Sequence, residues 1–193
     1  MIRRVELQDA KAIAAIYNEY VIHSVVTFDI EPVREEDMRG RIAGISAHYP
    51  YFVCESDGKV VGYCYAHPWK QRVAYGHTLE TTVYLLPDCV GKGMGTQLMM
   101  RLIEECRREG YHALIACLTE PNEDSTSLHT KLGFQKVSHF KEVGLKFGRW
   151  LDVSDYELIR EAGLISADGT VLAHSSPDQN GTSRAERNYF KAG

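Results

Sequence analysis

The hydrophobic and polar positions of this chain follow two spacings, which predict helices and strands in a mixed order. Apolar residues recur every three to four positions in four segments, as they do in amphipathic helices, and we expect helices over residues 6–24, 32–49, 96–106 and 123–132. Shorter runs rich in β-branched and aromatic residues predict strands over residues 2–5, 51–55, 59–66, 80–86, 113–118, 134–143 and 145–158. This order predicts a single α/β domain built on a mixed sheet.

Four local patterns place these elements more closely. Ser56-Asp57-Gly58 predicts a hairpin turn between two strands. The strand at 113–118 is apolar on both faces, so we expect it in the middle of the sheet. The last two strands are expected to turn around Gly144. Residues 25–30 form an extended apolar segment that we expect to wall a pocket, with Phe28 as a candidate substrate contact.

Composition limits the class of protein. With 193 residues, of which 44% are hydrophobic, the chain is long enough to bury one core. The net charge of −4 argues against nucleic-acid binding, which needs a basic surface. No apolar run reaches membrane-spanning length and no signal peptide opens the chain, so we expect a cytoplasmic protein that does not bind membranes. The five cysteines form no CxxC pair and the eight histidines show no metal-ligand spacing, which predicts free thiols and no metal site.

The composition changes after about Arg160. Residues 161–193 are rich in Ser, Ala, Gly and Asp and have little periodicity, which is typical of a loosely ordered tail. We therefore expect a folded domain over residues 1–160 and a tail over residues 161–193. A tail without function is favoured over a regulatory segment.

The stretch from Glu80 to Cys106 combines a strand, a glycine-rich loop and a helix, and Gly91, Gly93 and Gly95 stand in the loop. Glycines let backbone amides approach another molecule, and the first amides of a helix lack internal partners and carry a partial positive charge. The combination predicts a phosphate-binding loop, with a plain turn as the alternative. The loop lacks the Gly-Lys-Ser/Thr of a Walker motif, and its glycine spacing does not fit a dinucleotide fold.

A second pattern occupies residues 121–134, which read Pro-Asn-Glu-Asp-Ser-Thr-Ser-Leu-His-Thr-Lys-Leu-Gly-Phe. Asn122 is expected to cap a helix, and its side-chain amide would be free to bond a carbonyl of a ligand. Ser125 and His129 share one face of that helix, which would carry His129 toward whatever the glycine loop holds. For His129 the alternative is a core histidine with its hydrogen bonds satisfied.

Together the two patterns resemble the acetyl-CoA signatures of the GNAT N-acetyltransferases. The first signature, Gln/Arg-x-x-Gly-x-Gly/Ala, matches at Gly93 and Gly95, whereas Val90 stands at the Gln/Arg position and would remove one polar contact. The second, Asn-x-x-Ala/Ser-x-x-x-His/Tyr-x-x-x-Gly-Phe, matches at Asn122, Ser125, His129, Gly133 and Phe134. The resemblance implies a GNAT-like mixed, mostly antiparallel sheet with helices on both faces, and acetyl-CoA as co-substrate without a metal.

Three further segments resemble the phosphinothricin N-acetyltransferase branch of that family. They are Trp69-Lys70-x-Arg72-x-x-Tyr75, the strand Glu80-Thr-Thr-Val-Tyr, and Phe147-Gly148-Arg149-Trp150-x-Asp152-Val153. The resemblance covers about residues 1–158. It implies transfer of an acetyl group to the α-amino group of a small acidic or polar amino acid, of the phosphinothricin or methionine sulfoximine type. It also implies a homodimer joined through the C-terminal strands.

The resemblance implies roles for single residues as well. Glu80 would be the general base, directly or through water, and His129 would either assist that base or protonate the leaving sulfur. The pyrophosphate would bind to Gly91, Lys92, Gly93, Met94, Gly95 and Thr96. The pantetheine arm would lie along Val83, Tyr84, Leu85, Asn122 and Ser125. The acid group of the acceptor would be held by Lys70, Arg72 and Tyr75.

Two other functions stay open from the sequence. Acetylation of a protein N-terminus or of a lysine would need a wide acidic groove, and the cations Lys70 and Arg72 argue against it. A CoA-binding protein without catalysis would fit the valine at position 90, whereas the presence of Glu80 and His129 argues against it.

Overall fold

The computed structural model describes residues 1–160, 164–165 and 171–173. The chain divides into two compact units, residues 1–160 and residues 161–193. In the second unit the described residues form two short antiparallel strands, β9 (Leu164–Ile165) and β10 (Val171–Ala173). The tail predicted over residues 161–193 lies, apart from these two strands, outside the described residues.

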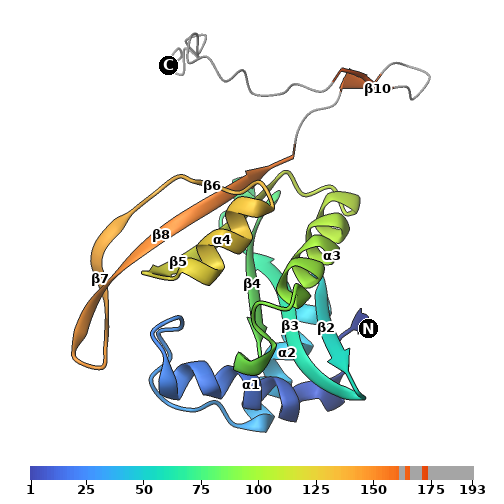
Figure 1. Cartoon of the computed structure of the whole chain (residues 1–193). Coiled ribbons are helices and arrows are strands. Elements are labelled where there is room, and N and C mark those ends of the chain that lie inside the picture. The colour runs from blue at the N-terminus through green and yellow to red at the C-terminus, as the bar shows by residue number, and fades with distance from the viewer. Residues whose placement is uncertain (161–163, 166–170, 174–193) are drawn as a thin grey trace. The chain divides into compact units, whose positions relative to one another are not determined.

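The first unit has the mixed order of helices and strands that the hydrophobic pattern predicts (Figure 1). Its helices are α1 (Ala10–His23), α2 (Glu35–Ser46), α3 (Met94–Arg108) and α4 (Glu123–Lys131), with single 3-10 turns at Leu7–Asp9, Val73–Tyr75 and Pro87–Cys89. Its strands are β1 (Ile2–Arg4), β2 (Tyr51–Ser56), β3 (Lys59–Pro68), β4 (Thr78–Leu85), β5 (Ala113–Glu120), β6 (Gln135–Lys136), β7 (Phe140–Lys146) and β8 (Arg149–Ile159). None of the described helices is both long and apolar enough to cross a membrane.

The strands of this unit form one sheet in the order β1-β2-β3-β4-β5-β8-β6, with β7 also paired to β8. Neighbouring strands run antiparallel except β4 and β5, which are parallel. The sheet is therefore mixed and mostly antiparallel, as the resemblance implied. Because β5 lies between β4 and β8, the prediction that the strand with two apolar faces is internal is confirmed.

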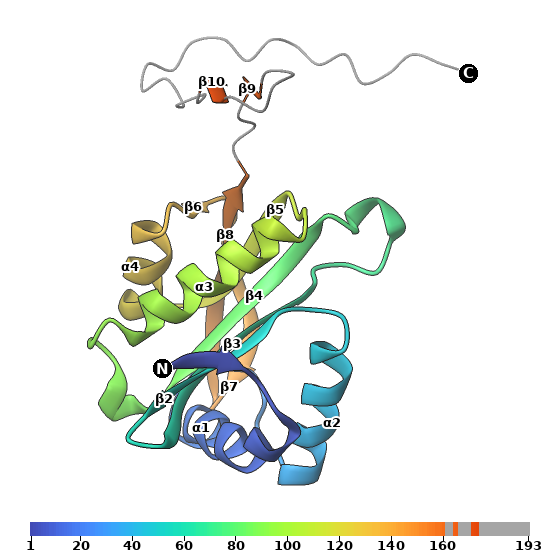
Figure 2. The ribbon, with the colours of Figure 1, turned by 90° about the vertical axis from the view of Figure 1, so that its right-hand side faces the viewer.

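Helices pack on both faces of the sheet (Figure 2). Helix α3 buries one apolar stripe against strands β2 to β5, made of Leu98, Met99, Leu102, Ile103 and Cys106. Helices α1 and α2 cover part of the other face, where their aliphatic side chains meet an aromatic set from β2 and β3 that includes Tyr51 and Tyr63. The helical spacing of the apolar residues sets which side of each helix is buried.

The second helix is shorter than predicted. It begins at Glu35, three residues after Pro32, because the side chain of Asn18 bonds both backbone groups of Val33 and holds that residue outside the helix. The Nδ2 donates to the Val33 carbonyl at 2.9 Å, and the Oδ1 accepts from the Val33 amide at 2.8 Å. The helix ends at Ser46 rather than at residue 49.

The first predicted hairpin is confirmed, and the position of the last one is wrong. Asp57 and Gly58 join β2 to β3 with positive φ angles of 51° and 72°, as tight hairpin turns require. The last hairpin turns at Phe147 and Gly148, with φ angles of 50° and 70°. Gly144 lies inside β7 instead, where the ring of Phe28 occupies the space that a side chain would need.

Leu102 tests the core formed by α3. This residue is fully buried, so Leu102→Ala should lower the free energy of unfolding by about 2–5 kcal/mol through lost burial and a cavity. Met100 lies on the same helix and is 57% exposed, so Met100→Ala should change it by less than about 0.5 kcal/mol. Urea unfolding followed by circular dichroism measures both, and equal losses would contradict the assigned orientation of α3.

Candidate active site

The parallel strands β4 and β5 part from each other at one point. They pair only through Thr78–Glu80 and Ala113–Ile115, although both strands continue. Thr81 bridges the start of the gap, because its Oγ1 donates to the Ile115 carbonyl at 3.1 Å. Beyond that point β4 continues to pair with β3 on one side, while its other edge has left β5. The two strands therefore splay apart here, which frees backbone groups for a ligand.

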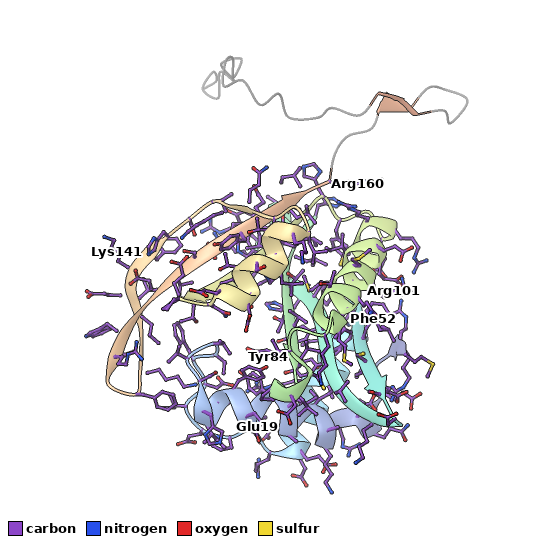
Figure 3. The ribbon with its side chains drawn as sticks, in the orientation of Figure 1. Glu19, Phe52, Tyr84, Arg101, Lys141 and Arg160 are labelled. Atoms are coloured by element: carbon purple, nitrogen blue, oxygen red, sulfur yellow. The ribbon has the colours of Figure 1, made fainter. Side chains whose placement is uncertain are left out.

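Tyr20 of α1 closes the far end of this open edge. Its hydroxyl donates to the Leu85 carbonyl at 2.7 Å. Tyr84 lies against the rings of Tyr17 and Tyr20, at centroid distances of 5.3 and 5.1 Å, and Figure 3 shows it between β4 and α1. Tyr20 is not among the predicted site residues, because its spacing in the sequence indicates only the buried face of a helix.

The glycine loop follows β4 and leads into α3. Gly91 and Gly93 have positive φ angles of 76° and 80°, which residues with side chains rarely adopt. Gly93 is the N-cap of α3 and has no side chain to cap the first amides of the helix, which therefore stay available. A Cβ at Gly95 would stand 3.4 Å from Leu85 and 3.5 Å from Leu128. The positive end of α3 thus lies beside the end of β4 and next to α4.

The other predicted loop residues surround these amides. Lys92 is exposed, whereas Met94 and Thr96 are half-buried. Val83 is half-buried on β4 and belongs to the side of the sheet that α3 covers. Helix α3 begins at Met94, two residues earlier than predicted, so the whole predicted phosphate segment forms the loop and the first turn of this helix.

Helix α4 begins with the predicted cap. The Oδ1 of Asn122 accepts from the Ser125 amide at 3.2 Å, which leaves the side-chain NH₂ group of Asn122 for other partners. His129 is 2% exposed, and its Nδ1 lies 2.7 Å from the Ser125 carbonyl. The ring meets Phe134 edge-on at 5.1 Å, and burial lowers the pKa of His129. His129 is therefore a buried histidine held by its own helix.

Glu80 lies at the last position where β4 pairs with β5. Its side chain is 30% exposed, and Nε2 of His67 stands 3.8 Å from its Oε1. Burial raises the pKa of Glu80; His67 opposes this rise and Asp155 adds to it. A carboxylate with a raised pKa is a stronger base near neutral pH than an ordinary one.

Cys117 and Asp155 share a face of the sheet with Glu80. Ile115 is the β5 partner of Glu80, Cys117 follows two residues later, and Asp155 of β8 is the partner of Cys117; alternate strand positions share a face. Burial, together with the charges of Glu80 and Asp155, raises the pKa of Cys117 to about 12. His67, Cys117 and Asp155 are not among the residues predicted for the site. If β3 and β4 are paired outward from the loop that joins them, His67 lies opposite Glu80, so this residue could have been predicted. Asp155 could not, because its place depends on the pairing of β8 with β5.

The cationic loop lies between β3 and β4, directly before Glu80. The Nζ of Lys70 stands 3.8 Å from the ring centroid of Trp69 and 5.4 Å from that of Tyr75, as in cation–π contacts. The two rings meet edge-on at 5.3 Å, and Arg72 is exposed. Lys70 and Tyr75 are thus brought together around the ring of Trp69.

Phe28 belongs to a different segment, the residues that follow α1. It is 41% exposed, and its ring occupies the place where a side chain of Gly144 would be, with Cζ 2.2 Å from an added Cβ. The predicted wall segment therefore packs on β7. Among the described residues, no group of His, Cys, Asp or Glu could hold a metal ion.

Comparison with known proteins identifies the family. The acetyltransferase (GNAT) domain matches residues 2–154. A phosphinothricin N-acetyltransferase of Alcaligenes faecalis is 40% identical over 153 residues, which cover 78% of each chain. An L-methionine sulfoximine/L-methionine sulfone acetyltransferase of Salmonella typhimurium is 37% identical over 161 residues, covering 81% of this chain and 92% of that one.

A solved structure of similar fold supports the same family. The crystal structure of a GNAT superfamily phosphinothricin acetyltransferase from Sinorhizobium meliloti in complex with acetyl-CoA has a TM-score of 0.80 and 34% identity, covering 82% of this chain and 87% of that chain. The chain therefore belongs to the GNAT family of N-acetyltransferases, and the resemblance found in the sequence is confirmed.

Cys117 reports on the charges near Glu80. With a pKa raised from 9.0 to about 12, the Cys117 thiol should react with iodoacetamide at pH 7.5 about 1,000-fold more slowly than an ordinary thiol, because the thiolate is the reactive form. Asp155→Asn removes a negative charge and should speed the labelling, whereas the exposed Glu19→Gln should not. Peptide mass spectrometry over time measures the rate. Fast labelling of the unaltered protein would contradict this account.

Proposed function

We propose that this protein transfers an acetyl group from acetyl-CoA to the α-amino group of a small acidic or polar amino acid, of the phosphinothricin or methionine sulfoximine type. Residues 1–160 would be the catalytic domain. The observation that carries the proposal is the position of Glu80, where β4 and β5 part, together with its raised pKa. The activities named for the relatives support the choice of acceptor.

Acetyl-CoA would bind along the open edge of β4 with its pyrophosphate at the start of α3. The glycine loop from Gly91 to Thr96 supports this because its amides lie at the positive end of the α3 dipole. The pantetheine arm would run past Val83 and Tyr84, since the Leu85 carbonyl is already occupied by Tyr20. Asn122 would bond the arm through its side-chain NH₂ group. The solved relative in complex with acetyl-CoA supports this co-substrate.

Glu80 would accept the proton of the acceptor amine, directly or through water. An amine with a pKa near 10 is neutral in roughly 1 of 1,000 molecules at pH 7, so a nearby base contributes roughly 10²–10⁴-fold. The amine nitrogen would attack the thioester carbonyl and form a tetrahedral intermediate. Free amides of β4 would stabilise its oxyanion, and the intermediate would collapse with release of the CoA thiolate.

His129 would act as a proton acceptor that assists Glu80. A backbone carbonyl only accepts hydrogen bonds, so the 2.7 Å contact with Ser125 requires the hydrogen on Nδ1. Burial lowers the pKa of His129 and favours the neutral ring, whose Nε2 then carries a lone pair. This supports the assisting role over protonation of the leaving sulfur. Ser125 would contribute through its hydroxyl, because its amide and carbonyl are used within α4.

The acceptor would be held by its acid group and by an apolar wall. Lys70, Arg72 and Tyr75 lie in the loop that leads into β4 and Glu80, and their charge favours an anionic acceptor over a cationic one. Phe28 would form the wall.

Glu80→Gln provides the test of this mechanism. We expect turnover with phosphinothricin to fall roughly 10²–10⁴-fold, while acetyl-CoA binding is retained, because the amide keeps the shape and loses the base. Release of CoA measured with a thiol reagent and calorimetric titration with acetyl-CoA give the two quantities. Glu19→Gln is the control, since Glu19 is exposed on α1 (Figure 3). Unchanged turnover would remove Glu80 from the mechanism.

A panel of acceptors separates the other two functions. Acetylation of peptide N-termini or lysines in preference to phosphinothricin and methionine sulfoximine would favour a protein acceptor. Tight binding of acetyl-CoA without transfer to any amine would favour a CoA-binding protein.

We further propose a cytoplasmic homodimer joined through the β7–β8 hairpin. The outer side of this hairpin exposes Val143, Leu145 and Trp150 by 56%, 54% and 62%, and Leu145 and Trp150 are cross-strand partners. Exposed apolar groups that gather in this way support a protein interface. The five cysteines are free thiols, which supports a reducing compartment.

Trp150→Glu tests the interface. A charge in an apolar interface is costly to desolvate, so light scattering should show a monomer for this variant and a dimer for the unaltered protein. Met100→Glu also places a charge at an exposed apolar site, on α3, and should leave the mass unchanged. A monomeric unaltered protein would contradict the dimer.

A further inference from the structure

Lys146 is the only lysine that is buried among the described residues, with 1% of its surface exposed. The proposed mechanism does not use it. Its Nζ donates to the Thr27 carbonyl at 2.8 Å and approaches the Tyr20 carbonyl at 3.4 Å. A buried ammonium group is costly unless it is well bonded, so the contacts that hold it matter for what this residue does.

The end of α1 supplies much of what the ammonium group needs. Tyr20 lies in the last turn of this helix, and its carbonyl also accepts from the amide and the hydroxyl of Ser24, at 3.2 and 3.0 Å. Carbonyls at the C-terminal end of a helix carry partial negative charge and favour a cation. The ring of Phe147 adds a cation–π contact at 5.0 Å.

A second contact lies two residues earlier on β7. The absence of a side chain at Gly144 admits the ring of Phe28, since an added Cβ would stand 2.2 Å from its Cζ. Gly144 and Lys146 point to the same side of β7. The strand therefore holds the segment after α1 at two successive positions, by shape at Gly144 and by hydrogen bonds at Lys146. Figure 1 shows this segment, in blue, beside the β7–β8 hairpin.

The strand register relates this contact to the site. Gly144 is the partner of Leu151 on β8, and alternate residues lead from Leu151 to Asp155, the partner of Cys117. Gly144 and Lys146 therefore face the side of the sheet that carries Cys117 and Glu80. Phe28 packs on that same side, at the end of the sheet formed by the hairpin.

We infer that Lys146 is a positioning residue for the acceptor: it ties the residues 25–30 segment to β7 and so sets Phe28 as a wall of the acceptor site. This inference rests on the proposed function. Acetyl-CoA would depend on it less, because the glycine loop and the start of α3 lie on elements that Lys146 does not contact.

Lys146→Met keeps the length of the side chain and removes its hydrogen bonds. We expect the KM for the amino-acid acceptor to rise about 10-fold, while the KM for acetyl-CoA changes less than about twofold. Lys141→Met is the matched control, because Lys141 lies on the same strand, exposed on the outside of the hairpin (Figure 3). A lower melting temperature with both KM values unchanged would mean a purely structural role and would overturn the inference.

Gly144→Ala approaches the same contact from the other side. It keeps Lys146 and displaces the Phe28 ring, so the acceptor KM should again rise selectively. Gly44→Ala is its control, because nothing lies within 4 Å of a Cβ there. If Lys146→Met does not fold, Lys146→Gln and Gly144→Ala decide, and an unchanged acceptor KM in both overturns the inference.

Hydrogen exchange separates this inference from the proposed function. Without substrates, amides of residues 20–30 should exchange faster in Lys146→Met than in Lys141→Met. If the unaltered protein acetylates no amino acid, the proposed function fails, and the exchange data then decide alone whether Lys146 holds the segment. Equal exchange rates in the two variants would overturn it.

Discussion

The site depends on the place where β4 and β5 stop pairing. Backbone donors and acceptors normally satisfy one another within a sheet, so an open edge in the interior of a sheet needs other partners. Thr81 provides one at the start of the gap, and Tyr20 provides another at its far end. Between these two points the edge is left to a ligand. The start of α3 brings a partial positive charge to the same place, so an unpaired strand edge and the positive end of a helix lie beside each other.

Glu80 and Lys146 face the same side of the sheet, and the pKa of each is displaced in the direction that burial dictates. Burial raises the pKa of Glu80 and lowers that of Lys146. For Glu80 this displacement suits a base that must accept a proton near neutral pH. For Lys146 the helix end of α1 replaces a carboxylate as the stabilising group, which links the hairpin to the segment that carries Phe28.

Features that depend on residues close together in the sequence were predicted better than features that depend on distant residues. The helices, most of the strands, the internal position of β5 and the cap at Asn122 could be predicted, because each depends on neighbours within a few positions along the chain. The turn expected at Gly144 was wrong. A glycine pattern alone does not distinguish a turn from a close contact with a distant ring, and in this strand the ring is that of Phe28.

The sequence by itself determined the family, the glycine-rich loop before α3 and the place of Glu80 on its strand, since these are carried by short motifs with a local physical reason. The tertiary structure alone decided which residues surround Glu80. His67, Cys117 and Asp155 reach Glu80 through strand pairing, and Lys146 reaches Tyr20 across 126 positions of the chain. Such contacts depend on sheet order and register, which no local spacing of residues encodes.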